Sequence, residues 1–397
     1  MGQRAFLCGN EAVAEGVRLS APHVIAAYPI TPQTVVVERL AEMVEDGSVK
    51  AEFMHVESEH SALSASMGAS AVGARTFSST SSQGLVYMAE CLHYASGGRF
   101  PIVMMNANRS LALPWSIYGD HRDSMSLLDC GWIQVYTEDA QESLDMVLQA
   151  YAIAEHPEVL TPVMINLDGF VLTHTYELVD IPAWEQAREF LPPYETVNKL
   201  DFDAPKNMAF SSNPGNNLEF KLRQHRGMLR AKELIAETDG RFQAIFGRSY
   251  GGLTEAYRCD DAELIVVSVG SVTGTCRTVA DELRNEGWKV GVLKIRFMRP
   301  FPEEEIIAAL RNAKAVAVLD KDISFGYEGT VFTNVNSALS KAGAEILKLN
   351  FIGGLGGRDI SKDHIREMYR RLQDGLDGIA QENVQYLGLG VAIDERG

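Results

Sequence analysis

The segment Tyr28-Pro29-Ile30-Thr31-Pro32-Gln33-Thr34 closes an apolar run that covers residues 24–28. A second segment, Glu57-Ser58-Glu59-His60-Ser61-Ala62, lies a short way downstream and opens a stretch rich in Ala, Ser and Gly. The first segment is typical of a strand that ends in a Pro-punctuated turn. The second places two carboxylates and a histidine at the start of a helix built from small residues.

Apolar strands and helical segments alternate on both sides of these two segments. We expect strands at residues 24–28, 51–56, 75–79, 102–106, 132–136 and 163–167. We expect helices at residues 11–19, 34–44, 60–74, 84–96 and 140–156. This alternation predicts an α/β fold in which helices cover both faces of a parallel sheet.

The second part of the chain repeats this alternation after a change in composition. Residues 181–217 contain five prolines and read as an extended connection, and residues 218–237 read as an amphipathic helix. A second α/β unit begins near residue 262. Its expected strands cover residues 264–269, 290–295, 315–319 and 346–352, with a helix at 303–313. The glycine-rich residues 353–357 lack the spacing of a phosphate-binding loop and predict a tight turn near the subunit or cofactor interface.

The composition is ordinary for a globular protein and excludes several classes of partner. The chain has 397 residues, 46% apolar and 22% charged, with a formal net charge of −17. Such a charge disfavours nucleic acid and anionic membranes as partners. No apolar run is long enough for a membrane span, and residues 1–10 do not read as a signal peptide. We therefore expect a cytoplasmic protein.

The cysteines do not form a ligand pattern. They are far apart in the sequence, at Cys8, Cys91, Cys130, Cys259 and Cys276. The absence of any C-x-x-C pair argues against an iron–sulfur cluster and against a disulfide framework in this chain. Asp120, His121 and Asp123 have no second ligand cluster with them, so a pocket-lining loop is favoured over a metal site.

The two carboxylates of the second segment permit two readings. Glu57 and Glu59 could complement the positive end of the helix that follows them. Alternatively, one of them could hold a proton in a water-poor cleft, where burial raises the pKa of a carboxyl group. From the residues alone the first reading is favoured, and in the second reading Glu57 competes with Glu59 for the role.

Six segments in order resemble the α subunit of the 2-oxoacid:ferredoxin oxidoreductase family, of the pyruvate:ferredoxin oxidoreductase type. They are Y-P-I-T-P at 28–32, E-S-E-H-S-A at 57–62, T-x-S-Q-G at 80–84, N-R-x-x-x-x-P at 108–114, G-D-H-x-D at 119–123 and D-G-F-x-x-T-H at 168–174. The later half adds matches at residues 271–274, 295–302 and 354–359. Six ordered motifs are specific where one short match is weak, and the resemblance covers most of the chain.

The resemblance implies two domains and a division of roles. Residues 1–245, with a connector and helix at about 181–240, would form a pyrimidine-type, doubly wound thiamine diphosphate (ThDP) domain. Residues 246–397 would form a transketolase C-terminal-like α/β domain. Catalytic Glu59 would contact the ThDP aminopyrimidine with Pro29 and Ile30, while Thr31 and Arg109 would hold a 2-oxoacid. Further pocket residues would be Tyr28, Ser82, Gln83, Trp115, Tyr118, Asp120 and His121.

The chain lacks the Gly-Asp-Gly motif that precedes a Mg²⁺–diphosphate site in ThDP enzymes. The resemblance therefore implies that Mg²⁺ and the diphosphate belong to a β subunit, and that a γ subunit and a ferredoxin-like subunit complete the enzyme. The implied reaction is CoA-dependent oxidative decarboxylation of a 2-oxoacid to acyl-CoA and CO₂, with electrons passing to iron–sulfur clusters on other subunits.

Pyruvate is the favoured substrate. A branched-chain or aromatic 2-oxoacid such as 2-oxoisovalerate or phenylglyoxylate is the alternative, because residues 115–118 could shape a larger pocket. A non-catalytic scaffold is the alternative of another class, and loss of Glu59 or Arg109 would have favoured it. A decarboxylase without an electron acceptor would need the missing Gly-Asp-Gly motif.

Overall fold

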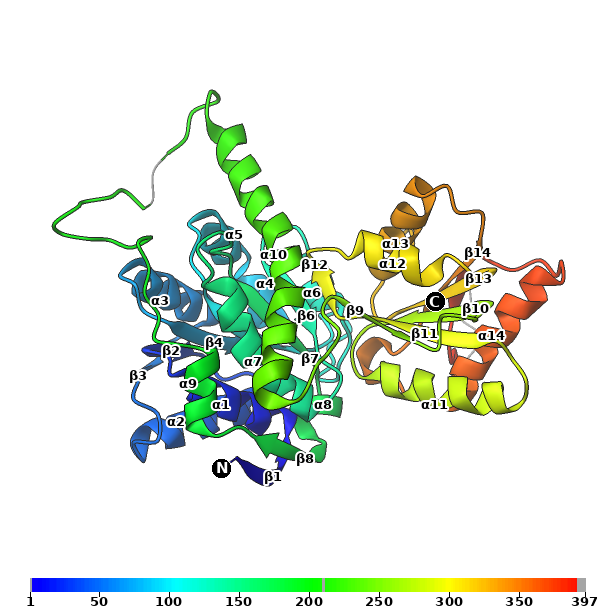
Figure 1. Ribbon diagram of the computed structural model, residues 1–397, viewed down its shortest axis with the longest axis horizontal. Coiled ribbons are helices and arrows are strands. Elements are labelled where there is room, and N and C mark those ends of the chain that lie inside the picture. The colour runs from blue at the N-terminus through cyan, green and yellow to red at the C-terminus, as the bar shows by residue number, and fades with distance from the viewer. Residues whose placement is uncertain (1, 209–210, 391–397) are drawn as a thin grey trace.

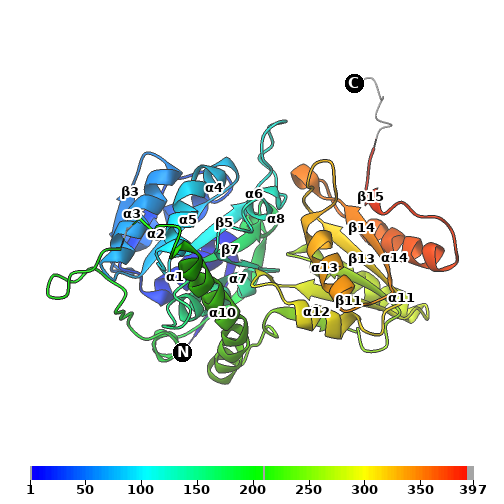
Figure 2. The ribbon, with the colours of Figure 1, turned by 90° about the horizontal axis from the view of Figure 1, so that it is seen from above.

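The computed structural model describes residues 2–208 and 211–390, which form two lobes side by side (Figure 1). The first lobe is built on a seven-stranded sheet and the second lobe on a six-stranded sheet. Seen from above, the lobes meet along one boundary, and helices flank each sheet (Figure 2). No helix within these residues combines the length and apolarity needed to cross a bilayer.

The first sheet is parallel except for one edge strand. Its order is β12 (Phe297–Arg299), β6 (Ile133–Tyr136), β7 (Val163–Asp168), β5 (Val103–Asn108), β4 (Thr76–Thr80), β2 (Val24–Ala27) and β3 (Glu52–His55). Strand β12 comes from the later part of the chain and pairs antiparallel with β6. A separate antiparallel pair joins β1 (Gln3–Cys8) to β8 (Tyr176–Ile181).

Helices cover both faces of the first sheet because its central strands are apolar on both sides. In β5, Val103 and Met105 face one core while Met104 faces the other, as the two-residue period of a strand requires. One layer contains α1 (Gly9–Ser20), α2 (Thr34–Glu45), α7 (Ala140–Ala154) and α10 (Asn217–Phe246). The other contains α3 (Glu59–Ala71), α4 (Gln83–Tyr87) and α5 (Ala89–Gly97).

The second lobe has the same layering. Its strand order is β15 (Val384–Tyr386), β14 (Leu347–Ile352), β13 (Ala315–Asp320), β10 (Leu264–Ser268), β11 (Val290–Ile295) and β9 (Thr254–Tyr257). One face packs on α12 (Glu303–Leu310) and α13 (Thr330–Lys341), the other on α11 (Val272–Asn285) and α14 (Lys362–Leu376). The predicted α/β class is confirmed in both lobes.

Several predicted element boundaries are wrong. Residues 84–96 form two helices, α4 and α5, and the connector contains a helix, α9 (Trp184–Phe190). Prolines stand just before and just after α9, so they delimit this helix instead of preventing it. Phe190 at its end packs edge-on against Phe242 of α10, with ring centroids 5.2 Å apart.

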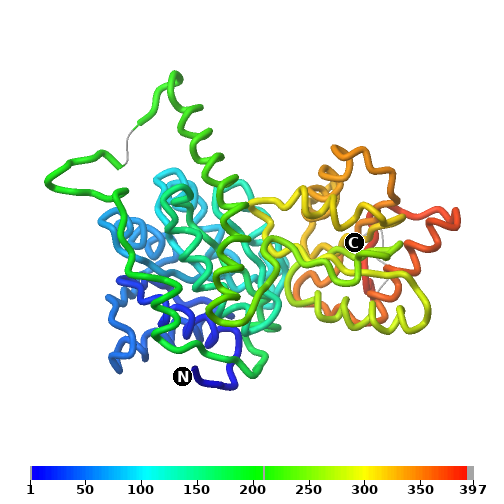
Figure 3. Tube along the Cα trace, in the orientation of Figure 1, coloured from blue at the N-terminus to red at the C-terminus, as the bar shows by residue number. Residues whose placement is uncertain are grey.

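Helix α10 is longer than the predicted 218–237 because a buried carboxylate stabilises its extension. Asp239 lies inside the helix and accepts hydrogen bonds from Ser249 Oγ and from the backbone of Tyr250 and Gly251. The other end of α10 projects beyond the first lobe, and the connector runs up to it as an arm (Figure 3).

Candidate functional site

Glu59 is the first residue of α3, at the edge where the parallel strands β2, β3, β4, β5 and β7 have their carboxyl ends. The preceding Ser58 caps the helix by accepting a hydrogen bond from Ser61 N at 3.1 Å. Glu59 is 8% exposed, whereas Glu57 is exposed and accepts a hydrogen bond from Ser61 Oγ that lowers its pKa. Of the two carboxylates, Glu59 is therefore the one that sits in a water-poor position.

Gly84 closes one side of the space around Glu59. A β-carbon at position 84 would lie 2.6 Å from Glu59 Oε1 and 2.7 Å from Thr80 Oγ1, so any larger residue would displace them. The Thr80 hydroxyl is buried and has no hydrogen-bond partner among the described residues. A buried carboxyl group and an unpaired hydroxyl thus share a narrow space that a side chain at position 84 would fill.

Arg109 and Thr31 lie together. Arg109 directly follows β5, is 5% exposed, and its Nη1 donates to the carbonyl of Thr31 at 3.0 Å. Its Nε donates to the carbonyl of Ser116 at 3.1 Å, and its Cζ lies 5.9 Å from the centre of the Trp115 ring. Burial lowers the pKa of Arg109. No described residue accepts a hydrogen bond from its Nη2, so that group is available to a ligand.

Asp123 ties the strand ends at this edge together, a role that the sequence did not indicate. It is fully buried and accepts hydrogen bonds from the backbone of Ser82 and Arg109 at 3.1 and 3.0 Å. The side chains of Asn106 and Asn108 donate to it as well. Burial raises the pKa of Asp123 although these bonds oppose the effect. In the sequence, Asp123 appears only as the last residue of the G-D-H-x-D segment and as part of a predicted pocket-lining loop.

A second buried carboxylate, Asp168 at the end of β7, lies where the two lobes meet. Its Oδ1 accepts from His121 Nε2 at 2.7 Å and from Lys321 Nζ at 2.5 Å. Its Oδ2 accepts from the backbone and the hydroxyl of Ser271. Burial opposes ionisation, but Lys321 and His121 hold the pKa of Asp168 well below its usual value. Asp168 is thus an anion with four donors, three of them from the second lobe.

The loop between Arg109 and His121 faces two ways. Trp115 and Tyr118 are exposed, and the Tyr118 ring lies 5.0 Å from that of Phe170. Asp120, by contrast, is buried and accepts a hydrogen bond from Gly356 N of the second lobe at 3.0 Å. The predicted tight turn at residues 353–357 therefore contacts this loop.

The other predicted residues lie around the same edge. Tyr28 and Pro29 are exposed and Ile30 is partly buried. The turn that they form is held by Gln33, whose Nε2 donates to the carbonyl of Tyr28 at 2.9 Å. Ser82 is buried and donates to Gln83, which is exposed.

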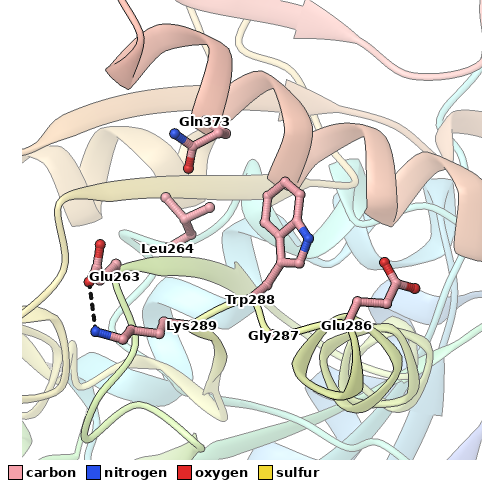
Figure 4. A pocket seen from close by; sticks show the side chains of 7 residues that line it. All are labelled: Glu263, Leu264, Glu286, Gly287, Trp288, Lys289 and Gln373. Atoms are coloured by element: carbon pink, nitrogen blue, oxygen red, sulfur yellow. Dashed lines mark hydrogen bonds and ion pairs between the residues drawn. The ribbon is translucent and has the colours of Figure 1, made fainter.

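Two pockets differ in their relation to this edge. A pocket of about 230 Å³ lies between the lobes, with Tyr118, Phe170 and Lys321 in its lining. A surface pocket of about 420 Å³ lies at the amino ends of β10 and β11 and is lined by Trp288, Lys289 and their neighbours (Figure 4). The second pocket is at the sheet edge opposite the one that faces the first lobe, and Lys289 and Glu263 of its lining form a surface ion pair.

Comparison with known proteins identifies the family of the chain. Residues 15–239 match the family model described as pyruvate flavodoxin/ferredoxin oxidoreductase, thiamine diphosphate-binding. The chain belongs to this family. Residues 262–365 match pyruvate:ferredoxin oxidoreductase core domain II, so this oxidoreductase family accounts for both lobes.

Curated relatives of this oxidoreductase chain cover almost its full length. Pyruvate synthase subunit PorA of Methanothermobacter thermautotrophicus is 48% identical over 383 residues, 96% of this chain and 97% of that protein. PorA of Methanocaldococcus jannaschii is 49% identical, over 94% of this chain and 95% of that protein. Ketoisovalerate oxidoreductase subunit VorA of Pyrococcus abyssi is 43% identical, over 91% and 92%.

A solved structure shares the fold. It is a 2-oxoglutarate:ferredoxin oxidoreductase from Magnetococcus marinus with 2-oxoglutarate, coenzyme A and succinyl-CoA bound, with a TM-score of 0.70 and 18% identity. The match covers 95% of this chain but 65% of that chain. The predicted resemblance and the fold that it implied are confirmed.

Proposed function

We propose that this chain is the α subunit of a pyruvate:ferredoxin oxidoreductase and supplies the pyrimidine half of a ThDP site together with the oxoacid-binding residues. The observation that carries the proposal is the buried carboxyl group of Glu59 beside Gly84, at the same sheet edge as the Arg109–Thr31 pair. The names of the PorA relatives favour pyruvate as the oxoacid.

The residues around Glu59 fit the ThDP aminopyrimidine. A water-poor carboxyl group can hold and return a proton at the ring atom N1′, and the unpaired Thr80 hydroxyl offers a further hydrogen bond in the same space. The glycine at position 84 leaves room beside Glu59 that any side chain would occupy. When bound, ThDP supplies the electron sink that permits cleavage of the bond next to a carbonyl group.

Arg109 would bind the substrate carboxylate. Its Nη2 is uncommitted, while bonds to Thr31 and Ser116 hold the rest of the guanidinium in place. Charge-assisted bonds from a fixed guanidinium orient a planar carboxylate well. The Thr31 hydroxyl would donate to a substrate oxygen. The exposed Trp115 and Tyr118 would bound the side chain of the oxoacid, as the turn at Tyr28–Ile30 would bound the cofactor.

A branched-chain oxoacid is the second candidate. The VorA relative is almost as similar to this chain as the PorA relatives are, and its name specifies ketoisovalerate. Trp115 is 71% exposed in a loop, so modest changes in that loop would alter the size of the substrate space.

Other subunits would supply what this chain lacks. No group of three His, Cys, Asp or Glu in residues 2–208 and 211–390 could hold a metal ion, and all five cysteines are buried and unpaired. We therefore assign Mg²⁺ and the diphosphate to a β subunit. The iron–sulfur clusters belong to a ferredoxin-like subunit, a γ subunit completes the complex, and CoA is a substrate. The chain on its own should then be inactive and bind ThDP weakly, and tight Mg²⁺-dependent binding by the single chain would contradict this division.

The test is turnover of the purified complex with CoA and a viologen dye against a panel of 2-oxoacids. We expect the highest kcat/KM with pyruvate; preference for 2-oxoisovalerate would select the second candidate, and no turnover of any 2-oxoacid would reject the proposal.

Glu59→Gln should lower kcat by at least about 100-fold, because an amide cannot exchange a proton as an acid does. The matched change Glu57→Gln should have little effect, since Glu57 is exposed. Hydrogen–deuterium exchange at C2 of bound ThDP would locate the defect, and a wild-type exchange rate in Glu59→Gln would remove Glu59 from the mechanism.

A further inference from the structure

The second lobe holds the loop that carries the oxoacid-binding residues. Lys321 follows β13 and contacts the first lobe twice: its Nζ donates to Asp168 at 2.5 Å, and its backbone carbonyl accepts from His121 N at 2.8 Å. Ser271, at the start of α11, donates twice to the other oxygen of Asp168. His121 is therefore fixed by a residue of its own lobe and by the backbone of the other lobe.

The 110–121 loop transmits this constraint to Arg109. The loop is closed by a hydrogen bond from Ser110 N to the carbonyl of Tyr118 at 3.0 Å. Its carbonyl at Ser116 accepts from Arg109 Nε, so the loop determines where the guanidinium points. At its far end, Asp120 and His121 are the residues that bond to the second lobe.

Where the two lobes meet, close contacts leave the backbone of the second lobe little room to shift relative to the first lobe. A β-carbon at Gly270 would lie 2.8 Å from Asp168 Oδ2, and one at Gly357 would lie 2.4 Å from Tyr118 Cβ. The backbone of the second lobe thus approaches the loop as closely as glycine permits. The side chains of Asp168 and His121 are 1% and 2% exposed, so the loss of one hydrogen-bond partner would leave a buried polar group unsatisfied.

We propose that Lys321 is a positioning residue for substrate binding, acting through the His121 turn on the loop that orients Arg109. The second lobe thereby takes part in oxoacid recognition without touching the oxoacid. This inference rests on the proposed role of Arg109 as the carboxylate site.

The test is Lys321→Met, made in the complete complex and compared with Lys321→Arg. The KM for the 2-oxoacid should rise by roughly 10- to 100-fold, the scale expected when a binding group is misplaced by about 1 Å. The affinity for ThDP should stay near wild type, because Glu59 and Gly84 lie outside the 110–121 loop. Lys321→Arg keeps a cation at Asp168 and should restore most of the loss. Lys341→Met is the matched control: Lys341 also lies in the second lobe and is ion-paired to Glu303, but its side chain is 62% exposed.

A readout independent of turnover is chymotryptic cleavage between residues 111 and 118, mapped by mass spectrometry. Trp115 and Tyr118 are exposed there, and we expect faster cleavage after these residues in Lys321→Met. Wild-type KM and wild-type cleavage in that variant would overturn the proposal. If the variant does not assemble, Ser271→Ala removes a single hydroxyl donor to Asp168, and it should change both readouts in the same direction by less. Absence of oxoacid turnover in the wild-type complex would instead reject the proposed function.

Discussion

Glu142 offers a demanding test of how the two lobes are held together. It lies in the first turn of α7 and is 1% exposed; its Oε1 accepts from Arg296 Nε at 2.5 Å and its Oε2 from Lys294 Nζ at 2.7 Å. Both cations are at most 2% exposed and belong to the later half of the chain. Glu142→Gln would leave two buried cations without their shared anion and would turn an amide N–H₂ toward a donor.

The magnitude follows from two routes that agree. Removal of one partner from a buried ion pair costs about 3–5 kcal/mol. Burial alone would raise the pKa of Glu142, but Lys294 and Arg296 lower it from 4.5 to about 2, a difference worth roughly 3 kcal/mol at neutral pH. A carboxyl group with a depressed folded-state pKa stabilises the protein above the unfolded-state value and loses that contribution as pH falls toward about 2.

We therefore expect Glu142→Gln to lower the free energy of unfolding by about 3 kcal/mol at pH 7. At pH 4 the difference in free energy of unfolding between the variant and the wild type should be about 1 kcal/mol smaller than at pH 7. At that pH the Glu142 carboxyl is largely protonated in the unfolded wild-type chain, so its ionisation stabilises the folded state less. Urea denaturation of the purified protein at both pH values, followed by circular dichroism, measures the difference. Glu42→Gln is the control: Glu42 is 65% exposed and paired with Arg39 at 3.0 Å, so its loss should cost less than about 1 kcal/mol. A loss below about 1 kcal/mol in Glu142→Gln would refute the reasoning.

Two further substitutions test the site. Gly84→Ala should lower kcat and ThDP affinity together, because the new methyl group would lie 2.6 Å from Glu59 Oε1. Gly68 is the control, a helical glycine whose added methyl group would meet nothing within 4 Å. Gly68→Ala should raise the free energy of unfolding by roughly 0.5–1 kcal/mol, measured by thermal or urea denaturation. Normal cofactor binding in Gly84→Ala would show that the space beside Glu59 is not used. Arg109→Lys should lose about 10- to 100-fold in kcat/KM for the oxoacid, since one charge-assisted bond is worth roughly 1.5–3 kcal/mol, while ThDP affinity in a titration stays near wild type. A loss of ThDP binding instead would make Arg109 a structural residue.

Much of the fold could be read from short-range patterns. Residues 25–27 and 264–268 lie in strands that are buried on both faces, and a continuous apolar run is what such strands require. The burial of Glu59 relative to Glu57 could not be read in the same way. Both residues lie at the helix start, and the close approach of Gly84, on a different helix, is made to Glu59.

The contacts that join the lobes could not be predicted from local sequence patterns. Lys321 and Asp168 are 153 residues apart, and no sequence pattern around either residue predicts that the two would pair. The same holds for Asp123: the G-D-H-x-D segment contains it, but the bonds that it accepts from Ser82 N and Arg109 N form only when the ends of β4 and β5 are brought to it. Long-range polar pairs of this kind depend on the complete tertiary arrangement, and helix or strand periodicity does not encode them.

Strand β12 makes the first lobe depend on a part of the chain that is synthesised late. Phe297 is 1% exposed and packs in the core of the first lobe, and β12 covers the otherwise open edge of β6. When α10 has just been synthesised, the strand that completes the sheet of the first lobe has therefore not yet been made. Until residue 299 emerges, β6 presents unpaired backbone groups, the feature that recruits other strands into aggregates. A fragment cut after α10 should carry the same liability permanently, and a graft of the first lobe onto another protein would need to bring residues 297–299 with it.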